Sequence, residues 1–154
     1  MKQTPDQKRI QDNLAPSAVS AEGFLGDDKR DVAAIVAADA AALERLGTTA
    51  ASLAARMRRV THRAAAGLGA TVEVAPGREA SVEEHRGSIP CPFRCAHRFM
   101  KRSTVLTDCA TGETVRYTDL NVHLIEKHGF FEGAGSPFRV EPDALAAALE
   151  GVEA

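Results

Sequence analysis

The stretches Cys91-Pro-Phe-Arg-Cys95 and His123-Leu-Ile-Glu-Lys-His128 contain the side chains that we expect to organise the fold. Two thiols separated by three residues can face one point across a tight turn, and one helix end can supply two imidazoles. Thiolate sulfur and imidazole nitrogen are the usual ligands of a tetrahedral structural zinc ion. These stretches therefore predict a structural Zn²⁺ site with the ligands Cys91, Cys95, His123 and His128.

The composition is compatible with a metal-stabilised protein outside membranes. The chain has 154 residues, of which 44% are hydrophobic and 5% aromatic, and much of the apolar fraction is alanine. Such a core is thin, so a bound metal would add stability. Neither a membrane-spanning apolar run nor a signal peptide is expected. Three cysteines, two of them close together, favour metal ligation in a reducing compartment, so we expect a cytoplasmic protein.

Local patterns divide the chain into three segments: an N-terminal arm (1–30), an α-helical hairpin (31–69) and a finger-like α+β domain (70–154). Asp31 is a typical helix N-cap and Gly47 a typical helix stop, and a second helix follows the Thr48-Thr49 pair. We expect the hairpin to form one compact unit with the third segment.

Residues 70–154 alternate between strand, turn and helix patterns. Strands are expected over 71–74, 81–89, 100–107 and 113–117, and helices over 120–128 and from Pro142 onward. The expected fold class is α+β, with an N-terminal α-helical hairpin, a small antiparallel sheet that carries the zinc knuckle and a β-hairpin, and C-terminal helices.

Residues 91–128 resemble the two-Cys, two-His zinc finger. The pattern is Cys-x3-Cys-x3-Phe-x20-Leu-x2-His-x4-His, in which Phe99 and Leu120 occupy the places of the finger's core residues. The gap between Phe99 and Leu120 is longer than is usual in that family, and a hairpin around Gly112 fills it. The resemblance implies a structural zinc site, whereas the long insertion argues against the family's DNA-reading role.

Two further features bear on the ligand set. His97 lies two residues after Cys95 and is the substitute ligand, while Cys109 is farther away at a hairpin tip. His123 and His128 lie about 140° apart around an ideal helix, so we expect the last turn to loosen if both bind one ion. The alternative without metal is a pair of reduced buried thiols beside two hydrogen-bonded histidines.

A metal-dependent enzyme is the alternative function. A catalytic zinc ion keeps an open position, which four protein ligands would fill. The helix sequence also lacks the metalloprotease patterns HExxH and HxxEH. An enzyme with an open zinc position near His97 and His123 therefore stands as an alternative, beside a purely structural zinc protein.

Residues 86–116 are basic within a chain whose net charge is −2. A partner patch is predicted from Arg94, Arg98, Lys101, Arg102 and Arg116, and bases can stack on Phe93, Phe99 and Tyr117. The helix at 120–128 carries no arginine, which disfavours reading of a DNA groove. We therefore expect a protein or RNA partner rather than a specific DNA site.

Asp39 lies on the apolar stripe of the first hairpin helix, where an unpaired carboxylate is costly. We expect it to form a structural ion pair, and the alternative is a functional acid that faces a cleft. The glycine-rich loop Phe130–Arg139 has two interpretations as well. Its phenylalanines anchor it to the core, or the loop is exposed and Arg139 receives an anion.

Both ends of the chain resemble a group of small bacterial cytosolic proteins of unassigned function. The residues that carry this resemblance are KQTPDQKRIQDN and GFLGDD near the start, and TDLNVHLIEKHGFFEGAGSPFR towards the end. The resemblance implies a compact cytosolic protein and no particular activity.

Overall fold

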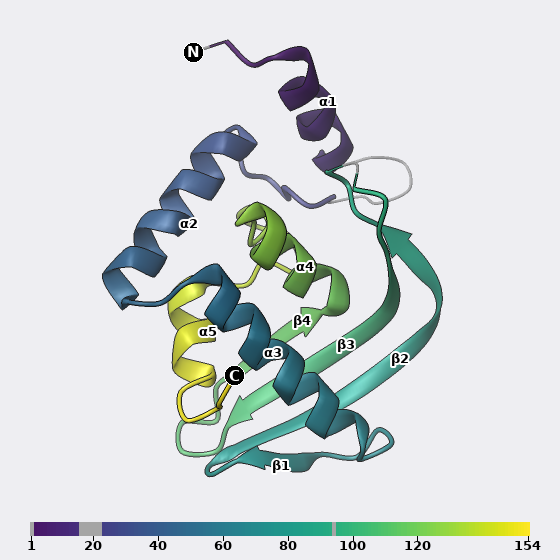
Figure 1. The fold of residues 1–154 in the computed structure, drawn as a ribbon, viewed down its shortest axis with the longest axis vertical. Helices are drawn as coiled ribbons and strands as arrows, with labels where there is room; N and C mark the ends of the chain where they lie inside the picture. Colours follow the sequence, from purple (N-terminus) through teal and green to yellow (C-terminus); the bar gives the residue numbers. More distant parts are fainter. Residues whose placement is uncertain (1, 16–22, 94) are drawn as a thin grey trace.

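The structure is a computed structural model that describes residues 2–15, 23–93 and 95–154. Its fold is α+β, as predicted, with helices before and after a four-stranded antiparallel sheet (Figure 1). The helices are α1 (Pro5–Leu14), α2 (Val32–Leu46), α3 (Ala50–Ala65), α4 (Asp119–His128) and α5 (Pro142–Ala148). The strands are β1 (Val72–Ala75), β2 (Arg78–Pro90), β3 (Arg98–Asp108) and β4 (Thr114–Thr118). No helix in the described ranges is long and apolar enough to cross a membrane.

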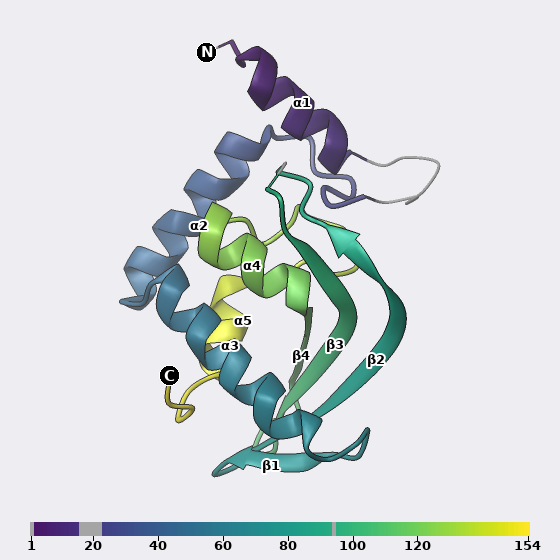
Figure 2. The ribbon, with the colours of Figure 1, turned by 45° about the vertical axis from the view of Figure 1, so that its right-hand side comes forward.

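The sheet has the strand order β1-β2-β3-β4 and is built around the long β2–β3 hairpin. Pairing in this hairpin runs from Arg78 opposite Asp108 to Pro90 opposite Arg98, with a bulge between His85 and Ser88. The outer strands are short. Strand β1 pairs only with residues 78–80 of β2, and β4 pairs only with residues 103–107 of β3. The far half of the hairpin therefore leaves the four-stranded sheet as a two-stranded ribbon, which curves around α4 (Figure 2).

The main core lies between the sheet and helices α3, α4 and α5, which cover the same face (Figure 1). Leu53, Met57 and Val60 follow a helical repeat along α3 and are fully buried. Tyr117 of β4 is also fully buried, and its hydroxyl donates a hydrogen bond to the Met57 carbonyl at 2.8 Å. Residue Tyr117 is thus part of the core and is not available to stack on a base, contrary to the sequence-based expectation.

Helices α2 and α3 are joined by the expected short connection but do not pack side by side. Gly47 ends α2 with φ of 68°, and the Thr49 side chain caps α3. From this turn the two helices diverge (Figure 1), so that α2 packs against α5 while α3 packs against α4 and the sheet. The physical reason is that α3 directs its apolar stripe to the sheet, whereas Ile35 of α2 belongs to a second cluster.

This second hydrophobic cluster lies where the ribbon meets the N-terminal helices. It consists of Leu14, Leu25, Ile35, Cys91, Leu120, Leu124 and Phe130. The arm is held there by polar contacts too, because the Asn13 amide donates to the Pro92 carbonyl at 3.2 Å. Helix α4 joins the two clusters, since Leu124 faces the second cluster and Ile125 faces the main core.

Candidate metal centre

The two cysteines lie in the connection between β2 and β3. Strand β2 ends at Pro90, directly before Cys91, and β3 begins at Arg98. The Cys91 amide donates a hydrogen bond to the His97 carbonyl at 3.2 Å, which closes the connection into a knuckle. Cys91 is buried and Cys95 is half-buried, so one thiol faces the second cluster and the other is nearer to solvent.

Helix α4 presents the two histidines to this knuckle. Thr118 and Asn121 form a capping box at its start, and Gly129 ends it with φ of 61°. His123 is buried and His128 lies in the last turn, with 5.3 Å between their ring centroids. The helix remains α-helical through His128. The last turn is therefore not loosened, contrary to the expectation from the sequence. The side chains rather than the backbone bring the two rings together.

The four predicted donors meet in one place. Their ligand atoms all lie within 4.8 Å of one another, from Cys91, Cys95, His123 and His128. The His128 Nε2 atom is 3.5 Å from the Cys91 Sγ and 3.1 Å from the Cys95 Sγ. Tetrahedral Zn–S and Zn–N bonds give ligand–ligand separations of about 3.4–3.8 Å. The cluster is therefore close to the size that a tetrahedral ion requires.

One atom of the cluster lacks the partner that burial demands. The Nε2 atom of His123 is buried, and it has no hydrogen-bond partner among the described residues. Buried polar side-chain atoms in proteins nearly always have a hydrogen-bond partner. Coordination of a metal ion by this nitrogen would satisfy it, so the residues present fit a metal ion.

The protonation tendencies of the donors also suit a metal. Burial lowers the pKa of His123, with the neighbouring His128 and His97 adding to the effect, and burial lowers the pKa of His128 as well. Both shifts favour the neutral imidazole, which is the form that binds metal. Burial raises the pKa of the Cys91 thiol, an effect to which nearby Cys95 adds. A bound dication reverses that preference, because a coordinating thiol loses its proton.

Two aromatic rings hold the imidazoles in position. Phe93, from the knuckle, stacks on His128 with 4.2 Å between centroids and 8° between planes. Phe99, from β3, lies 4.6 Å from the ring of His123. Contacts that orient a ligand ring are part of a metal site. The sequence indicated Phe99 as a core residue but did not predict that Phe93 stacks on His128. The position of Phe93 between the two cysteines is the one sequence signal for this contact.

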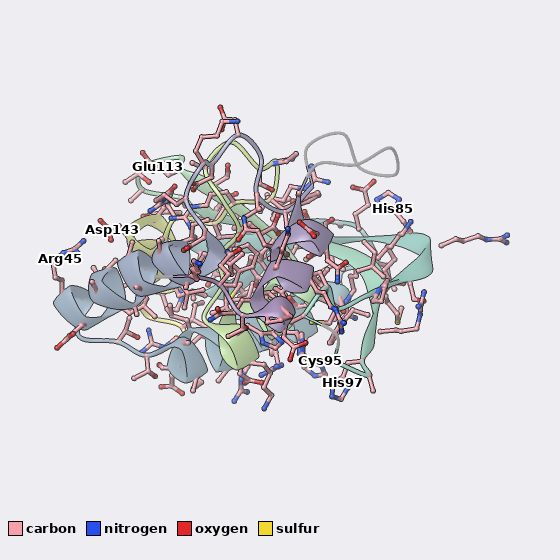
Figure 3. The ribbon with its side chains drawn as sticks, turned by 90° about the horizontal axis from the view of Figure 1, so that it is seen from above. Arg45, His85, Cys95, His97, Glu113 and Asp143 are labelled. Atoms are coloured by element: carbon pink, nitrogen blue, oxygen red, sulfur yellow. The ribbon has the colours of Figure 1, made fainter. Side chains whose placement is uncertain are left out.

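The remaining sulfur and imidazole candidates lie outside the group of four. His97 is exposed, with its ring centroid 5.6 Å from that of His123, so it borders the site (Figure 3). Cys109 is an exposed free thiol in the turn between β3 and β4. The structure thus places His97 next to the group of four but outside it, and it separates Cys109 from the knuckle.

The residues of the predicted basic patch have different surroundings. Arg94 lies outside the described residues. Arg102 pairs with Asp119, with 3.0 Å between Nη2 and Oδ2, and the Arg116 guanidinium lies over the ring of Phe138. The other two, Arg98 and Lys101, are exposed on the ribbon, and neither has a carboxylate partner among the described residues.

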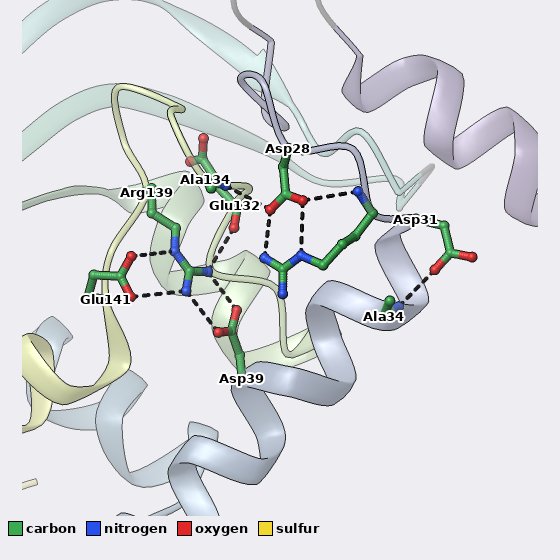
Figure 4. Close-up of polar contacts among 9 residues, drawn as sticks. Asp28, Asp31, Ala34, Asp39, Glu132, Ala134, Arg139 and Glu141 are labelled. Carbon is green, nitrogen blue, oxygen red and sulfur yellow. Dashed lines mark hydrogen bonds and ion pairs between the residues drawn. The ribbon is translucent and has the colours of Figure 1, made fainter.

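Asp39 is buried and forms an ion pair with Arg139 (Figure 4). The two terminal nitrogens of Arg139 donate to the Asp39 carboxylate at 2.6 and 2.9 Å. The same guanidinium also donates to the Glu141 carboxylate and to the Glu132 carbonyl. All five of its N–H groups are therefore used, and Arg139 has none left for an external anion.

The Phe130–Arg139 loop is anchored by its aromatic residues. Phe130 and Phe131 are both fully buried, one in each hydrophobic cluster. Glu132 is also buried, and its carboxylate accepts hydrogen bonds from the Asn121 amide and the Ser136 hydroxyl. Burial raises the pKa of Glu132. No sequence signal indicates this buried acid, because Glu in a glycine-rich loop usually faces solvent.

Comparison of the chain with protein-family models, curated proteins and solved structures finds no match. The fold and the site therefore define the protein only as an α+β protein with a candidate metal centre of two cysteines and two histidines. Any more specific function has to follow from the chemistry of its own residues.

Proposed function

We propose that the protein is a non-catalytic, zinc-stabilised cytoplasmic module that binds a macromolecule, either protein or RNA. The observation that carries the metal is the meeting of four donors within 4.8 Å. Two thiolates and two imidazoles are a typical ligand set of structural zinc, and the other common divalent ions of cells prefer oxygen ligands. Four protein ligands also leave no position for the water that a catalytic zinc ion activates.

The finger-like spacing supports the same proposal. Leu120 belongs to the second cluster and Phe99 packs against it, as the core residues of a small zinc module would. The ion would tie the tip of the β2–β3 ribbon to α4, two segments that are distant in the sequence. A structural zinc ion acts in this way, because it supplies folding energy where apolar burial is limited.

A macromolecular partner is supported by the ribbon rather than by the metal centre. The ribbon projects from the sheet and carries exposed positive charge, so it offers a surface more than an enclosed active site. The free thiols Cys91, Cys95 and Cys109 suit a reducing compartment such as the cytoplasm.

Metal analysis of the purified chain tests the metal centre. We expect about one zinc ion per chain, bound by two sulfur and two nitrogen atoms in X-ray absorption spectra. Cys91→Ser should lose the metal, and the matched control Cys109→Ser should keep it, because Cys109 is exposed in another turn. A folded wild-type protein that carries no metal and takes up none from added zinc would refute the proposal.

A further inference from the structure

Beyond the end of β1, the β2 strand of the ribbon is exposed, whereas Phe99 of β3 packs against the second cluster. All six β2 residues from Glu83 to Ser88 are exposed, whereas a strand with one covered face would alternate between buried and exposed. On the facing strand, Arg98, Met100 and Lys101 are exposed as well. Figure 3 shows His85 on this ribbon, well away from the edge that carries Cys95 and His97. The exposed part of the ribbon is therefore accessible to a partner.

Three cations of the ribbon have no carboxylate partner among the described residues. Arg98 donates to the side chain and carbonyl of Ser88, and neither Arg86 nor Lys101 makes a side-chain hydrogen bond or ion pair with any described residue. The Lys101 side chain passes over Gly87, within 4 Å of where a Cβ would lie, and Arg86 directly precedes Gly87 in the bulge. Unpaired cations on one ribbon attract phosphate groups.

The acids of the ribbon lie nearer to its base and face cations of their own. Glu84 lies 3.9 Å from Arg102, and Glu83 lies 3.8 Å from His85. These pairs lie next to the four-stranded sheet, whereas Arg98 and the bulge lie towards the knuckle. The charge along the ribbon is thus divided, with the unpaired positive part towards the knuckle.

A cleft of about 300 Å³ adjoins the ribbon between α3, β3 and α4. Its lining includes Arg58, Thr61, His62, Phe99, Arg102 and Asp119, and it borders the candidate metal ligand His123. Phe99 is half-buried and so contributes an aromatic surface. The Asp119 carboxylate, although paired with Arg102, has lone pairs left to accept from a hydroxyl. Volume, aromatic ring and mixed polarity suit one nucleotide.

We propose that the ribbon and this cleft bind single-stranded RNA. Phosphates would contact Arg86, Arg98 and Lys101, while one unstacked base occupies the cleft beside Phe99. A single strand fits better than a duplex, because only unstacked bases can enter such a cleft. Asp119 gives a reason for RNA over DNA, because a carboxylate can accept a hydrogen bond from the ribose 2′-hydroxyl. The inference rests on the proposed function, in which zinc holds the ribbon tip on α4.

Fluorescence anisotropy with the zinc-loaded full chain tests this inference. The probes are fluorescein-labelled ten-nucleotide oligouridylate and oligothymidylate, with a labelled oligoglutamate peptide as a polyanion that lacks bases. Three phosphate contacts on a single strand give a slope of about −2 for log K against log salt, so affinity should fall about twentyfold from 50 to 200 mM salt. RNA should bind more tightly than DNA, and the peptide should bind much more weakly.

Variants assign the contacts. Lys101→Ala should weaken RNA binding and reduce the magnitude of the salt slope by about 0.7. Arg45→Ala is the matched control, because Arg45 is exposed on α2 at the opposite end of the molecule (Figure 3). Asp119→Ala, which removes the acceptor, should lower the preference for RNA over DNA. Circular dichroism and metal content of each variant establish that it is folded and loaded.

The possible outcomes separate this inference from the metal proposal. Folded protein with one zinc ion and no RNA binding at 50 mM salt would refute the RNA site and leave the metal module intact. Equal affinity for RNA and oligoglutamate would also refute it and point to an acidic protein partner. Metal-free protein that still binds RNA with the expected slope would support the surface and remove the role of zinc.

Discussion

The Cys95 Sγ atom lies 3.1 Å from the His128 Nε2 atom, which joins the knuckle after β2 to the last turn of α4. The two residues are 33 positions apart in the chain. All of β3 and all of β4 lie between them. A metal ion at this point would therefore close a long loop, and loop closure by a metal stabilises a fold by restricting the unfolded chain.

Removal of zinc should loosen the second cluster before the main core. Cys91 belongs to the second cluster with Leu14 of α1, whereas the main core includes neither cysteine of the knuckle. Zinc at a free concentration 100- to 1000-fold above its Kd adds about 2.7–4.1 kcal/mol to the free energy of unfolding, and a chelator removes this contribution. The melting temperature should then fall by roughly 5–15 °C for a domain of this size.

Hydrogen exchange measures where that loosening occurs. Amides of α1 and of the ribbon tip should lose protection after chelation, while amides of α3 keep theirs. The same experiment on Cys91→Ser should give the pattern of the chelated wild type. Uniform loss of protection throughout the chain would show that the two clusters unfold as one unit, contrary to this prediction.

The fourth metal ligand, beside Cys91, Cys95 and His123, should be His128 rather than His97. His128 approaches both sulfur atoms, and its ring is held by Phe93, whereas His97 is exposed and lies outside the group of four donors. His128→Ala should therefore lower metal affinity by at least about tenfold, while His97→Ala should change it little. Competition with a chromophoric chelator measures both. An equal loss in the two variants would mean that His97 is also bound.

Much of the secondary structure could be predicted because helix ends depend on local residues. Asp31 caps α2 and Gly47 ends it in the left-handed conformation, as the sequence indicated, and Thr118 and Gly129 do the same for α4. These signals need only a few neighbouring residues to act.

The arrangement of elements was harder to predict. Whether α2 packs on α3 or on α5 depends on which surfaces meet in three dimensions, and the apolar stripe of α2 fits either partner. Leu46 shows that the sequence pattern alone does not determine burial, because it continues the apolar stripe of α2 but is 41% exposed. Likewise, Tyr117 looked available for stacking until the fold placed it under α3.

The candidate site was partly predictable for a similar reason. Ligand spacing is local on each side, so Cys91 with Cys95 and His123 with His128 could be recognised separately. The stacking of Phe93 on His128 and the pairing of Arg139 with Asp39 join distant segments, and the residue types alone do not select these partners.

Breaking the Asp39–Arg139 pair should be strongly destabilising. Both side chains are largely buried, at 7% and 12% exposure, so removal of one partner leaves a charge without compensation. Asp39→Ala should cost about 3–5 kcal/mol in urea unfolding, and Asp39→Leu combined with Arg139→Met should recover part of this loss. The exposed pair Arg58–Glu126 is the control, because Arg58→Ala should cost no more than about 1 kcal/mol. A cost for Asp39→Ala as small as that of Arg58→Ala would contradict the prediction.

Glu132→Gln should be neutral or stabilising at pH 7, unlike Glu132→Ala. Burial raises the pKa of Glu132, so its ionisation in the folded protein is unfavourable relative to the unfolded chain. A glutamine can still accept from the Asn121 amide, and the Ser136 hydroxyl can turn to accept from the new amide group. Alanine would leave both partners unpaired, at about 1–3 kcal/mol for each buried group.

The pH dependence gives this prediction its sign. A carboxyl group with a raised pKa contributes stability that is complete below its unfolded pKa and is lost as pH rises through the folded pKa. Wild type should therefore lose stability relative to Glu132→Gln as the pH increases from below the ordinary glutamate pKa towards neutrality. Urea unfolding of both proteins across this range measures the difference. A wild type that gains on Glu132→Gln with rising pH would show that hydrogen bonds to the carboxylate outweigh its burial.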